Sequence, residues 1–560
     1  MPASTLDTTP QAPVWGVASN AEPTPYPTSA VEQALARAAQ PDYFSWLDHV
    51  RAAAGCTRPI RLAGDLLTIE TATGRLLDAR HTDQMPDAAI YKACGNRRAT
   101  VCPACARTYQ ADAYQLLRAG MTGGKGVPET VTGHPAVFVT LTAPSFGAVH
   151  TRVVRRHTCT HRTRCDCRPE PCHARRDQPT CPHHQPAVCW TRHEPTDPRL
   201  GQPLCLDCYD HDHQAVWNLH SGQLWHHTKQ TAERHLTHLA RTRGIPFHRV
   251  TTPSGRTRYL PPVRISHGKV AEMQRRGVVH FHAVLRLDGI DPHDPDTIVA
   301  PPPGLTIHDL TTAVTHAAAV TAVHTPPHPD QPTGWPITWG DEGTGHHADI
   351  RPITLTGHGD NLTEQAVAGY LAKYATKSTE TTGHTCTRLT PDTITTHADP
   401  DGEHIPRLID ACWRLGRPTH TPAPLADRPP QQPGTIPPRP RPIGYARLRR
   451  WAHMLGYGGH FLTKARRYST TFTHLRHTRT HYRRHEHPEP TGAAPIDARI
   501  GKDTRTVSVL TYAGTGWHTT GDALLANTAA ALARDRQQTA REELAHHTAT
   551  TSVAAIPAAA

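Results

Sequence analysis

The sequence has no run of apolar residues that approaches the 18 needed to cross a membrane. Residues 1–30 lack a basic start followed by an apolar core, so no signal peptide is visible. Both absences lead us to expect a cytoplasmic protein with no membrane partner. In that reducing compartment, the 14 cysteines are expected to bind metal rather than to form disulfides.

Other features are scarce rather than absent. Aromatic residues make up 6% of the chain, whereas 53 residues are proline, so much of the chain is expected to be loop or disordered. Only eight of the 60 basic residues are lysine. The net charge of +12 nevertheless favours a polyanionic partner. No Walker motif is present, so the chain is not expected to unwind DNA by itself.

The segment from Val270 to Leu285 predicts a β-hairpin that holds a metal ion. Side chains alternate along a strand, so His280 and His282 share one face while their apolar neighbours face a core. The turn at 275–277 folds the preceding strand back and brings Glu272 or Gln274 near the histidines. A His-apolar-His triplet occurs about once by chance at this histidine content. The prediction therefore depends on the apolar strand, the glycine turn and the acidic residue eight positions upstream.

The segment from Gly369 to Lys377 predicts a helix with chemistry on one face. Tyr370, Lys373, Tyr374 and Lys377 are spaced i, i+3, i+4 and i+7, and Thr363 is the predicted N-cap. A tyrosine stripe at this spacing is usually core packing, but two interleaved lysines argue against burial. Phenols can attack a phosphodiester, and ammonium groups can offset the charge that develops on its oxygens.

These segments resemble the three motifs of the HUH endonuclease superfamily. The motifs correspond, in order, to residues 138–142 (Phe-Val-Thr-Leu-Thr), 280–282 (His-Phe-His) and 370–377 (Tyr-Leu-Ala-Lys-Tyr-Ala-Thr-Lys). The two-tyrosine form is similar to the gene A replication proteins of small single-stranded DNA phages. Residues 94–98, 123–128 and 448–472 resemble the replication initiators of actinomycete rolling-circle plasmids and integrative conjugative elements. This likeness covers most of residues 41–480.

The resemblance implies a rolling-circle initiator that nicks one strand of an origin by tyrosine transesterification. It implies that Tyr370 or Tyr374 attacks, leaving a 5′-phosphotyrosine and a free 3′-OH. It also implies Mg²⁺ or Mn²⁺ held by His280, His282 and Glu272, with Lys373 and Lys377 beside the phosphate. The expected partners are origin DNA, single-stranded and duplex, with a host helicase and DNA polymerase. The alternatives are a rolling-circle transposase, a conjugative relaxase and a zinc-dependent DNA-binding regulator without catalysis.

Eleven of the 14 cysteines lie between Cys94 and Cys208. Residues 150–210 form a polar insertion that cannot build its own apolar core, so structural zinc is expected there. The pairs Cys102-x2-Cys105 and Cys205-x2-Cys208 are the most ligand-like, although the pattern leaves the grouping open. The predicted zinc ligands are Cys94, Cys102, Cys105, Cys181, Cys189, Cys205 and Cys208.

The predicted fold is α+β, an HUH-like antiparallel sheet flanked by helices, with the zinc insertion and a basic C-terminal region. The expected domains are a disordered tail (1–40), an N-terminal region (41–134) and the nicking domain (135–380). A Pro-rich linker (381–443), a basic DNA-binding segment (444–490) and a C-terminal strand, helix and tail (491–560) follow. The basic segment mixes cations with aromatic residues, a pattern that suits phosphate contacts and base stacking. The predicted DNA-binding residues are Arg447, Arg449, Arg450, Lys464, Arg466 and Arg467.

Overall fold

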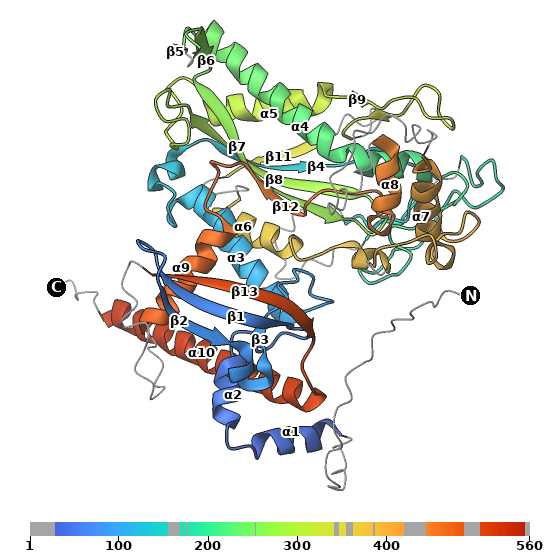
Figure 1. Cartoon of the computed structure of the whole chain (residues 1–560). Coiled ribbons are helices and arrows are strands. Elements are labelled where there is room, and N and C mark those ends of the chain that lie inside the picture. The colour runs from blue at the N-terminus through green and yellow to red at the C-terminus, as the bar shows by residue number, and fades with distance from the viewer. Residues whose placement is uncertain are drawn as a thin grey trace, which may run out of the picture. The chain divides into compact units, whose positions relative to one another are not determined.

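The computed structural model describes residues 29–154, 169–174, 177–251, 254–340, 347–353, 362–384, 387–418, 444–486 and 504–554. The chain divides into two units, Gly95–Gly501 and Met1–Cys94 with Lys502–Ala560. Figure 1 shows both. Among the described residues, no helix is long and apolar enough to span a bilayer.

The larger unit is built on a five-stranded antiparallel sheet with the strand order β11-β4-β8-β7-β12. β7 and β8 form its long central hairpin and are joined by a tight turn. Two-stranded ribbons, β5 with β6 and β9 with β10, lie outside this sheet. The strands are β4 (Ala136–Leu141), β5 (His248–Thr251), β6 (Thr257–Leu260), β7 (Val263–Met273), β8 (Val279–Gly289), β9 (Val323–His324), β10 (Pro336–Ile337), β11 (Ala348–Pro352) and β12 (Leu462–Lys464).

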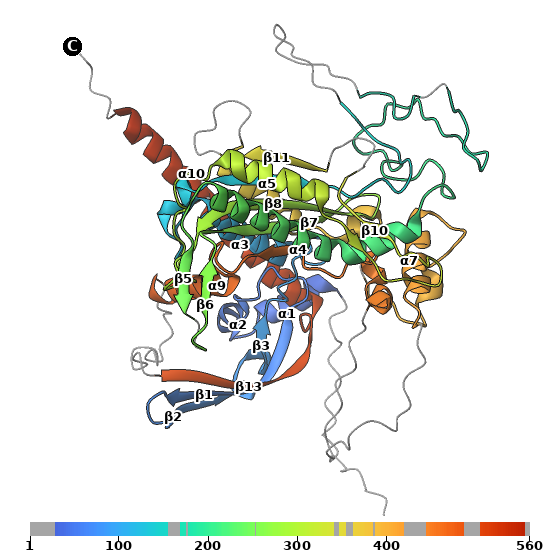
Figure 2. The same cartoon turned by 90° about the horizontal axis from the view of Figure 1, so that it is seen from above.

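Helices cover both faces of this sheet (Figures 1 and 2). Residues 279, 281, 283, 285 and 287 of β8 join the main core, to which α4 (His211–Thr242) and α5 (Ile307–Val320) contribute. The opposite face packs against α3 (Pro103–Thr122) and α6 (Glu364–Tyr374), with Val284, Leu117 and Leu371 in a second core. The alternation of β8 therefore supplies both cores, and the predicted α+β class with an antiparallel sheet is confirmed.

A buried ion pair lies on the α3 side of β8. Arg286 donates to both carboxylate oxygens of Asp288, over 2.7 and 2.8 Å, and to the backbone carbonyl of Tyr468 over 3.2 Å. His134 Nδ1 lies 2.8 Å from Asp288 Oδ1, and Arg286 and Asp288 are both fully buried. Burial alone would raise the pKa of Asp288, but hydrogen bonds from His134 and Arg286 hold that pKa below its usual value.

Replacing Arg286 with alanine is expected to lower the free energy of unfolding by about 3–5 kcal/mol, because it leaves the Asp288 carboxylate buried without the guanidinium group that balances its charge. Chemical denaturation monitored by circular dichroism measures the loss. Arg234→Ala, at an exposed position of α4, is the matched control and should change stability by less than about 0.5 kcal/mol. Equal stability of the two variants would contradict a structural role for the pair.

The smaller unit has a sheet in which β1 (Ile60–Glu70) pairs with β13 (Thr504–Thr515) along its whole length. β2 (Leu76–His81) and β3 (Ile90–Lys92) also pair with β1. Its helices are α1 (Ala30–Ala38), α2 (Tyr43–Val50) and α10 (Thr520–Ala554), and Trp46 and Ala526 are buried in its core. The C-terminal strand therefore belongs with the N-terminal region rather than forming a separate terminal segment.

Three of the expected domain boundaries differ from the structure. Helix α3 lies within the expected N-terminal region but covers the sheet of the larger unit. Part of the expected linker is α7 (His404–Leu415), whose Leu408 is fully buried in the main core. The basic segment supplies β12, the edge strand of the central sheet, as well as α8 (Arg447–Arg450) and α9 (Phe472–Glu486). The apolar stripe of α7 therefore outweighs its proline-rich surroundings.

Some expectations lie outside the described residues. These are the disorder of residues 1–28, most of the Pro-rich linker at 419–443, and the cysteines Cys159, Cys165, Cys167 and Cys386. Of the expected tail at 1–40, residues 30–38 form α1, whose N-cap Ser29 makes a capping box with Glu32.

Candidate functional site: a histidine hairpin facing a tyrosine helix

The β7–β8 hairpin places Glu272 directly opposite His280, and Val270 opposite His282. Its turn is closed by two backbone hydrogen bonds, from Gln274 N to Val278 O and from Gly277 N to Gln274 O, each 2.9 Å. Gly277 has a φ of 74°, and a Cβ there would lie 2.7 Å from Leu455 Cδ1. Any other residue would be strained at this φ, so the predicted glycine turn favours the register that brings Glu272 and the histidines onto one face.

The two imidazoles lie side by side with their ring centroids 4.6 Å apart. His282 Nε2 is 3.1 Å from a carboxylate oxygen of Glu272, and His282 Nδ1 is 3.2 Å from Thr140 Oγ1. Gln274 Nε2 lies 3.4 Å from His280 Nδ1. Thr140, in the first of the three motifs, therefore holds the His282 ring from behind, so that its Nε2 faces the same side as Glu272.

Burial, followed by the charges of His282 and Arg276, lowers the pKa of His280 to about 3. His280 is therefore neutral at physiological pH, which is the form that binds a cation. Two imidazole nitrogens and a carboxylate on one face of a hairpin suit a divalent cation and leave positions for phosphate oxygens. The donor set at Glu272, His280 and His282 thus fits Mg²⁺ or Mn²⁺ chemistry.

Helix α6 presents its tyrosines to this hairpin. Thr363 is its N-cap and accepts a hydrogen bond from Ala366 N over 3.2 Å, as predicted. The Tyr370 hydroxyl lies 3.4 Å from His282 Nε2, and the two rings are perpendicular with centroids 5.0 Å apart. The Tyr374 ring lies 4.6 Å from that of Tyr370 and 5.7 Å from that of His282. Both phenols therefore face the histidines, and Tyr370 is in closer contact.

Both phenols are held in their protonated form. Burial, followed by the proximity of Tyr374 and Glu272, raises the pKa of Tyr370. Burial and the Glu272 charge also raise the pKa of Tyr374. Tyr370 nevertheless remains 40% exposed.

The lysines are placed differently from the prediction. The helix ends at Tyr374, so Lys377 lies in the following turn rather than on the same helical face. Its Nζ still lies 4.5 Å from the centroid of the Tyr374 ring, a cation–π contact. Lys373 is on the helix and exposed. Lys373 therefore neighbours the tyrosines along the helix, whereas Lys377 neighbours them through its contact with the Tyr374 ring.

The segment after α6 is anchored by Arg97, which the sequence marked only through its family likeness. Its guanidinium donates to the carbonyls of Ala375 over 3.1 Å and Lys377 over 2.6 Å, and lies 3.9 Å from the centroid of the Phe461 ring. The neighbouring Arg98 pairs with Glu380 at 3.0 Å. These contacts occupy carbonyls left free where the helix ends, and so they fix the end that carries Tyr374.

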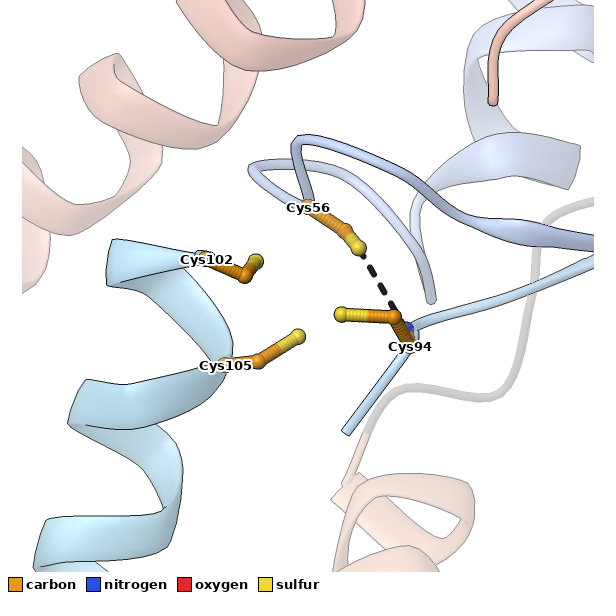
Figure 3. A group of neighbouring side chains, drawn as sticks. All are labelled: Cys56, Cys94, Cys102 and Cys105. Carbon is orange, nitrogen blue, oxygen red and sulfur yellow. Dashed lines mark hydrogen bonds between the residues drawn. The ribbon is translucent and has the colours of Figure 1, made fainter. Parts of the chain in front are cut away.

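Within the described residues, three groups of cysteine and histidine have ligand atoms that all lie within 4.8 Å of one another. Glu272, His280 and His282 do not form a group of this compactness. The first group consists of Cys56, Cys94, Cys102 and Cys105, in which the Cys94 amide donates to Cys56 Sγ over 3.3 Å (Figure 3). The other two are His150, Cys172, Cys189 and His193, and Cys181, His183, Cys205 and Cys208.

These groups assign all seven predicted zinc cysteines. Cys94, Cys102 and Cys105 fall in one group, and Cys181, Cys205 and Cys208 in another, whereas Cys189 belongs to the third. Four thiolates or a Cys/His mixture within this distance are suited to tetrahedral zinc. The prediction missed Cys56, His150, Cys172, His183 and His193 as members. Cys172 and His183 lay within the insertion expected to bind zinc, and Cys189-x3-His193 has ligand-like spacing, whereas nothing local marked Cys56 or His150.

A family model described as "Replication initiator protein, pSAM2" matches residues 42–531 of the chain. A replication initiator protein of Streptomyces ambofaciens is 39% identical over 518 residues, which cover 90% of this chain and 94% of that protein. The chain belongs to this replication initiator family. No solved structure matches it.

The basic segment of this initiator is more integrated into the fold than predicted. Arg449 donates to the Trp413 carbonyl over 2.8 Å, Lys464 to that of Arg466 over 3.1 Å, and Arg466 and Arg467 both pair with Asp296. Arg447 and Arg450 are exposed. The aromatic residues Tyr457, Phe461 and Tyr468 are buried, so base stacking by these three, which the sequence pattern favoured, is excluded in this conformation.

Proposed function

We propose that this initiator nicks one strand of its origin by metal-assisted tyrosine transesterification. The observation that carries the proposal is the position of the Tyr370 hydroxyl, 3.4 Å from His282 Nε2, the nitrogen that also lies 3.1 Å from Glu272. A nucleophile and a cation site that converge on one point can hold the two sides of a single scissile phosphate.

In the proposed reaction the Tyr370 oxygen attacks the phosphorus, and the bond between phosphorus and the 3′ oxygen breaks. The phenol proton leaves and the departing oxygen is protonated, so the products are a 5′-phosphotyrosine and a free 3′-OH. A divalent cation bound by Glu272, His280 and His282 would supply charge that polarises the phosphate. The phosphodiester energy is kept in the new ester, so the reverse reaction reseals the strand.

The second phenol gives the site a way to end a round of replication. Tyr374 lies one helical turn from Tyr370, and their ring centroids are 4.6 Å apart. While Tyr370 holds the first 5′ end, Tyr374 can cleave a regenerated origin. The 3′-OH that this second cleavage releases then attacks the Tyr370 ester. Lys377, over the Tyr374 ring, would offset the charge of that second attack.

The proposed partners are origin DNA, single-stranded at the cleavage site and duplex around it, with Arg447 and Arg450 among its phosphate contacts. The basic balance of the chain favours such a partner. Since the sequence lacks a Walker motif, strand separation and synthesis are assigned to a host helicase and polymerase.

The test is a nicking assay on the full-length chain with Mn²⁺ and labelled single strands from the DNA around its own gene. A protein–DNA adduct that survives denaturation is expected, and EDTA should prevent it. In the variant Tyr370→Phe with Tyr374→Phe the adduct should vanish, with DNA affinity changed less than about threefold, because only two hydroxyls are removed. Tight binding without an adduct on every flanking sequence would instead favour a non-catalytic regulator.

Arg97→Ala is expected to slow nicking by about 10–100-fold while leaving DNA affinity nearly unchanged. The substitution frees the carbonyls of Ala375 and Lys377, and a shift of about 1 Å in a nucleophile's helix costs up to about 10²-fold in rate. Single-turnover rates at saturating enzyme measure the effect. Arg98→Ala, which removes the Glu380 pair but leaves both carbonyl contacts of Arg97 in place, is the control and should lose less than Arg97→Ala. Equal losses in both variants would show that Arg97 does not position the helix.

A further inference from the structure

The polar insertion after β4 contains a group that sequence spacing did not assemble: His150, Cys172, Cys189 and His193. Cys189 Sγ lies 3.5 Å from His193 Nε2, and His193 Nε2 lies 3.2 Å from His150 Nδ1. Cys172 Sγ lies 3.7 Å from His150 Nδ1. Tetrahedral bonds of about 2.0–2.3 Å to zinc place their ligand atoms about 3.3–3.8 Å apart. The spacing within the group therefore matches a zinc site.

The backbone around the group is arranged to support such a site. His173 and Cys189 exchange backbone hydrogen bonds of 2.8 and 3.0 Å, which sets Cys172 beside Cys189. The Thr151 amide donates to Cys172 Sγ over 3.2 Å. His193 is buried, and its Nδ1 is 2.7 Å from a carboxylate oxygen of Asp197, which orients the ring so that Nε2 faces the group.

Asp197 also links this group to the β7–β8 hairpin. Arg275, in the turn between β7 and β8, donates to the backbone carbonyls of Asp197 over 3.0 Å and Pro195 over 2.9 Å. A Cβ on Gly201 would lie 2.8 Å from Arg275 Cβ, so the insertion backbone packs directly against the turn. The insertion (teal) and α7 lie at the same end of the sheet in both views (Figures 1 and 2).

The turn is also held by the start of α4, which begins at His211. Gln214 donates to the Arg276 carbonyl over 2.9 Å. Asn218 donates to the Gly277 carbonyl over 2.9 Å and accepts from the Val279 amide over 3.0 Å. The turn is therefore fixed between two segments, and Gln274 and His280, which contact each other, lie at its two ends.

We propose that His150, Cys172, Cys189 and His193 bind a structural zinc ion, and that this zinc site holds the β7–β8 turn in place through Asp197 and Arg275. The insertion has little apolar core of its own, so without the ion its 193–201 segment loses the order needed to hold Arg275. The consequence for nicking rests on the proposed function, whereas the consequence for the turn does not.

The experiment combines zinc analysis with hydrogen exchange on the full-length protein. Cys172→Ser with Cys189→Ser is expected to lose one zinc ion per chain and to raise amide exchange in residues 274–280 at least about tenfold. Arg275→Ala is expected to keep all of its zinc and to raise exchange in the same residues. Arg249→Ala, on the separate ribbon β5, should change neither quantity.

Unchanged zinc content in the double serine variant would overturn the site. The link to the turn would be overturned if exchange in residues 274–280 stayed unchanged after zinc is lost. It would also be overturned if that exchange stayed unchanged in Arg275→Ala. If the double serine variant misfolds, shown by faster exchange in β4, then Arg275→Ala decides the link, and zinc content of the single His193→Gln variant decides the site. Absence of nicking in the wild-type protein would contradict the proposed function but would leave both of these readouts standing.

Discussion

Replacing His282 with alanine is expected to reduce nicking by about 10³-fold or more, because this side chain joins every part of the proposed site. Its Nε2 lies beside Glu272 and the Tyr370 hydroxyl, and its Nδ1 beside Thr140. The substitution removes a proposed cation ligand and the contact with the proposed nucleophile. Added Mn²⁺ should not restore the rate, since the two remaining donors, Glu272 and His280, cannot replace the lost geometry.

A graded series separates metal binding from general damage. Thr140→Val removes only the partner of His282 Nδ1, so it should cost about 10–100-fold, in the range found for outer-shell partners of metal ligands. His324→Ala, at an exposed position of β9, is the histidine control and should nick at the wild-type rate. If His282→Ala retained more than a tenth of the wild-type rate with an intact fold, a catalytic cation at this hairpin would be excluded.

Tyr370→Phe is expected to abolish the first cleavage, with a loss of about 10³-fold or more, whereas Tyr374→Phe should reduce it less than about tenfold. The asymmetry follows from position: the Tyr370 hydroxyl is 3.4 Å from His282 Nε2, and its side chain is 40% exposed. The Tyr374 ring lies farther from the His282 ring, with centroids 5.7 Å apart against 5.0 Å for Tyr370, and beside the Lys377 ammonium group.

The second half of the reaction should show the reverse pattern. With a preformed adduct at Tyr370 and a fresh origin strand, the wild-type chain should transfer strands, while Tyr374→Phe should stall at the adduct. Strand-transfer products resolved on a denaturing gel measure this step. Equal first-cleavage rates in the two single variants would show that the phenols are interchangeable, and the assigned order would be wrong.

The local parts of the site could be predicted from sequence because short-range geometry decides them. A period of two puts His280 and His282 on one face, and a period near four brings Tyr370 to Tyr374. The glycine turn indicated that Glu272 or Gln274 would lie near the histidines, and the strand register places Glu272 directly opposite His280. The limit appears at Lys377, where the same helical period was extended past the residue at which α6 ends.

Long-range pairings were not predictable in this way. Nothing local to Cys56 or His150 marks either residue as part of a metal group. The nearest group member along the chain is 38 residues away from Cys56 and 22 residues away from His150. The pairing of β1 with β13 joins residues more than 400 positions apart. The burial of Tyr457 and Tyr468 depends on α3, α4 and the sheet, so a basic and aromatic pattern alone was misleading about base stacking.

The most direct test of the account is to identify the residue that carries DNA after cleavage. The wild-type chain is allowed to nick a short labelled strand with Mn²⁺, the adduct is digested with nuclease and protease, and the modified peptide is sequenced by mass spectrometry. A nucleotide joined through its 5′ phosphate to Tyr370 is expected. Attachment to a tyrosine outside α6, or through a 3′ phosphate, would contradict it.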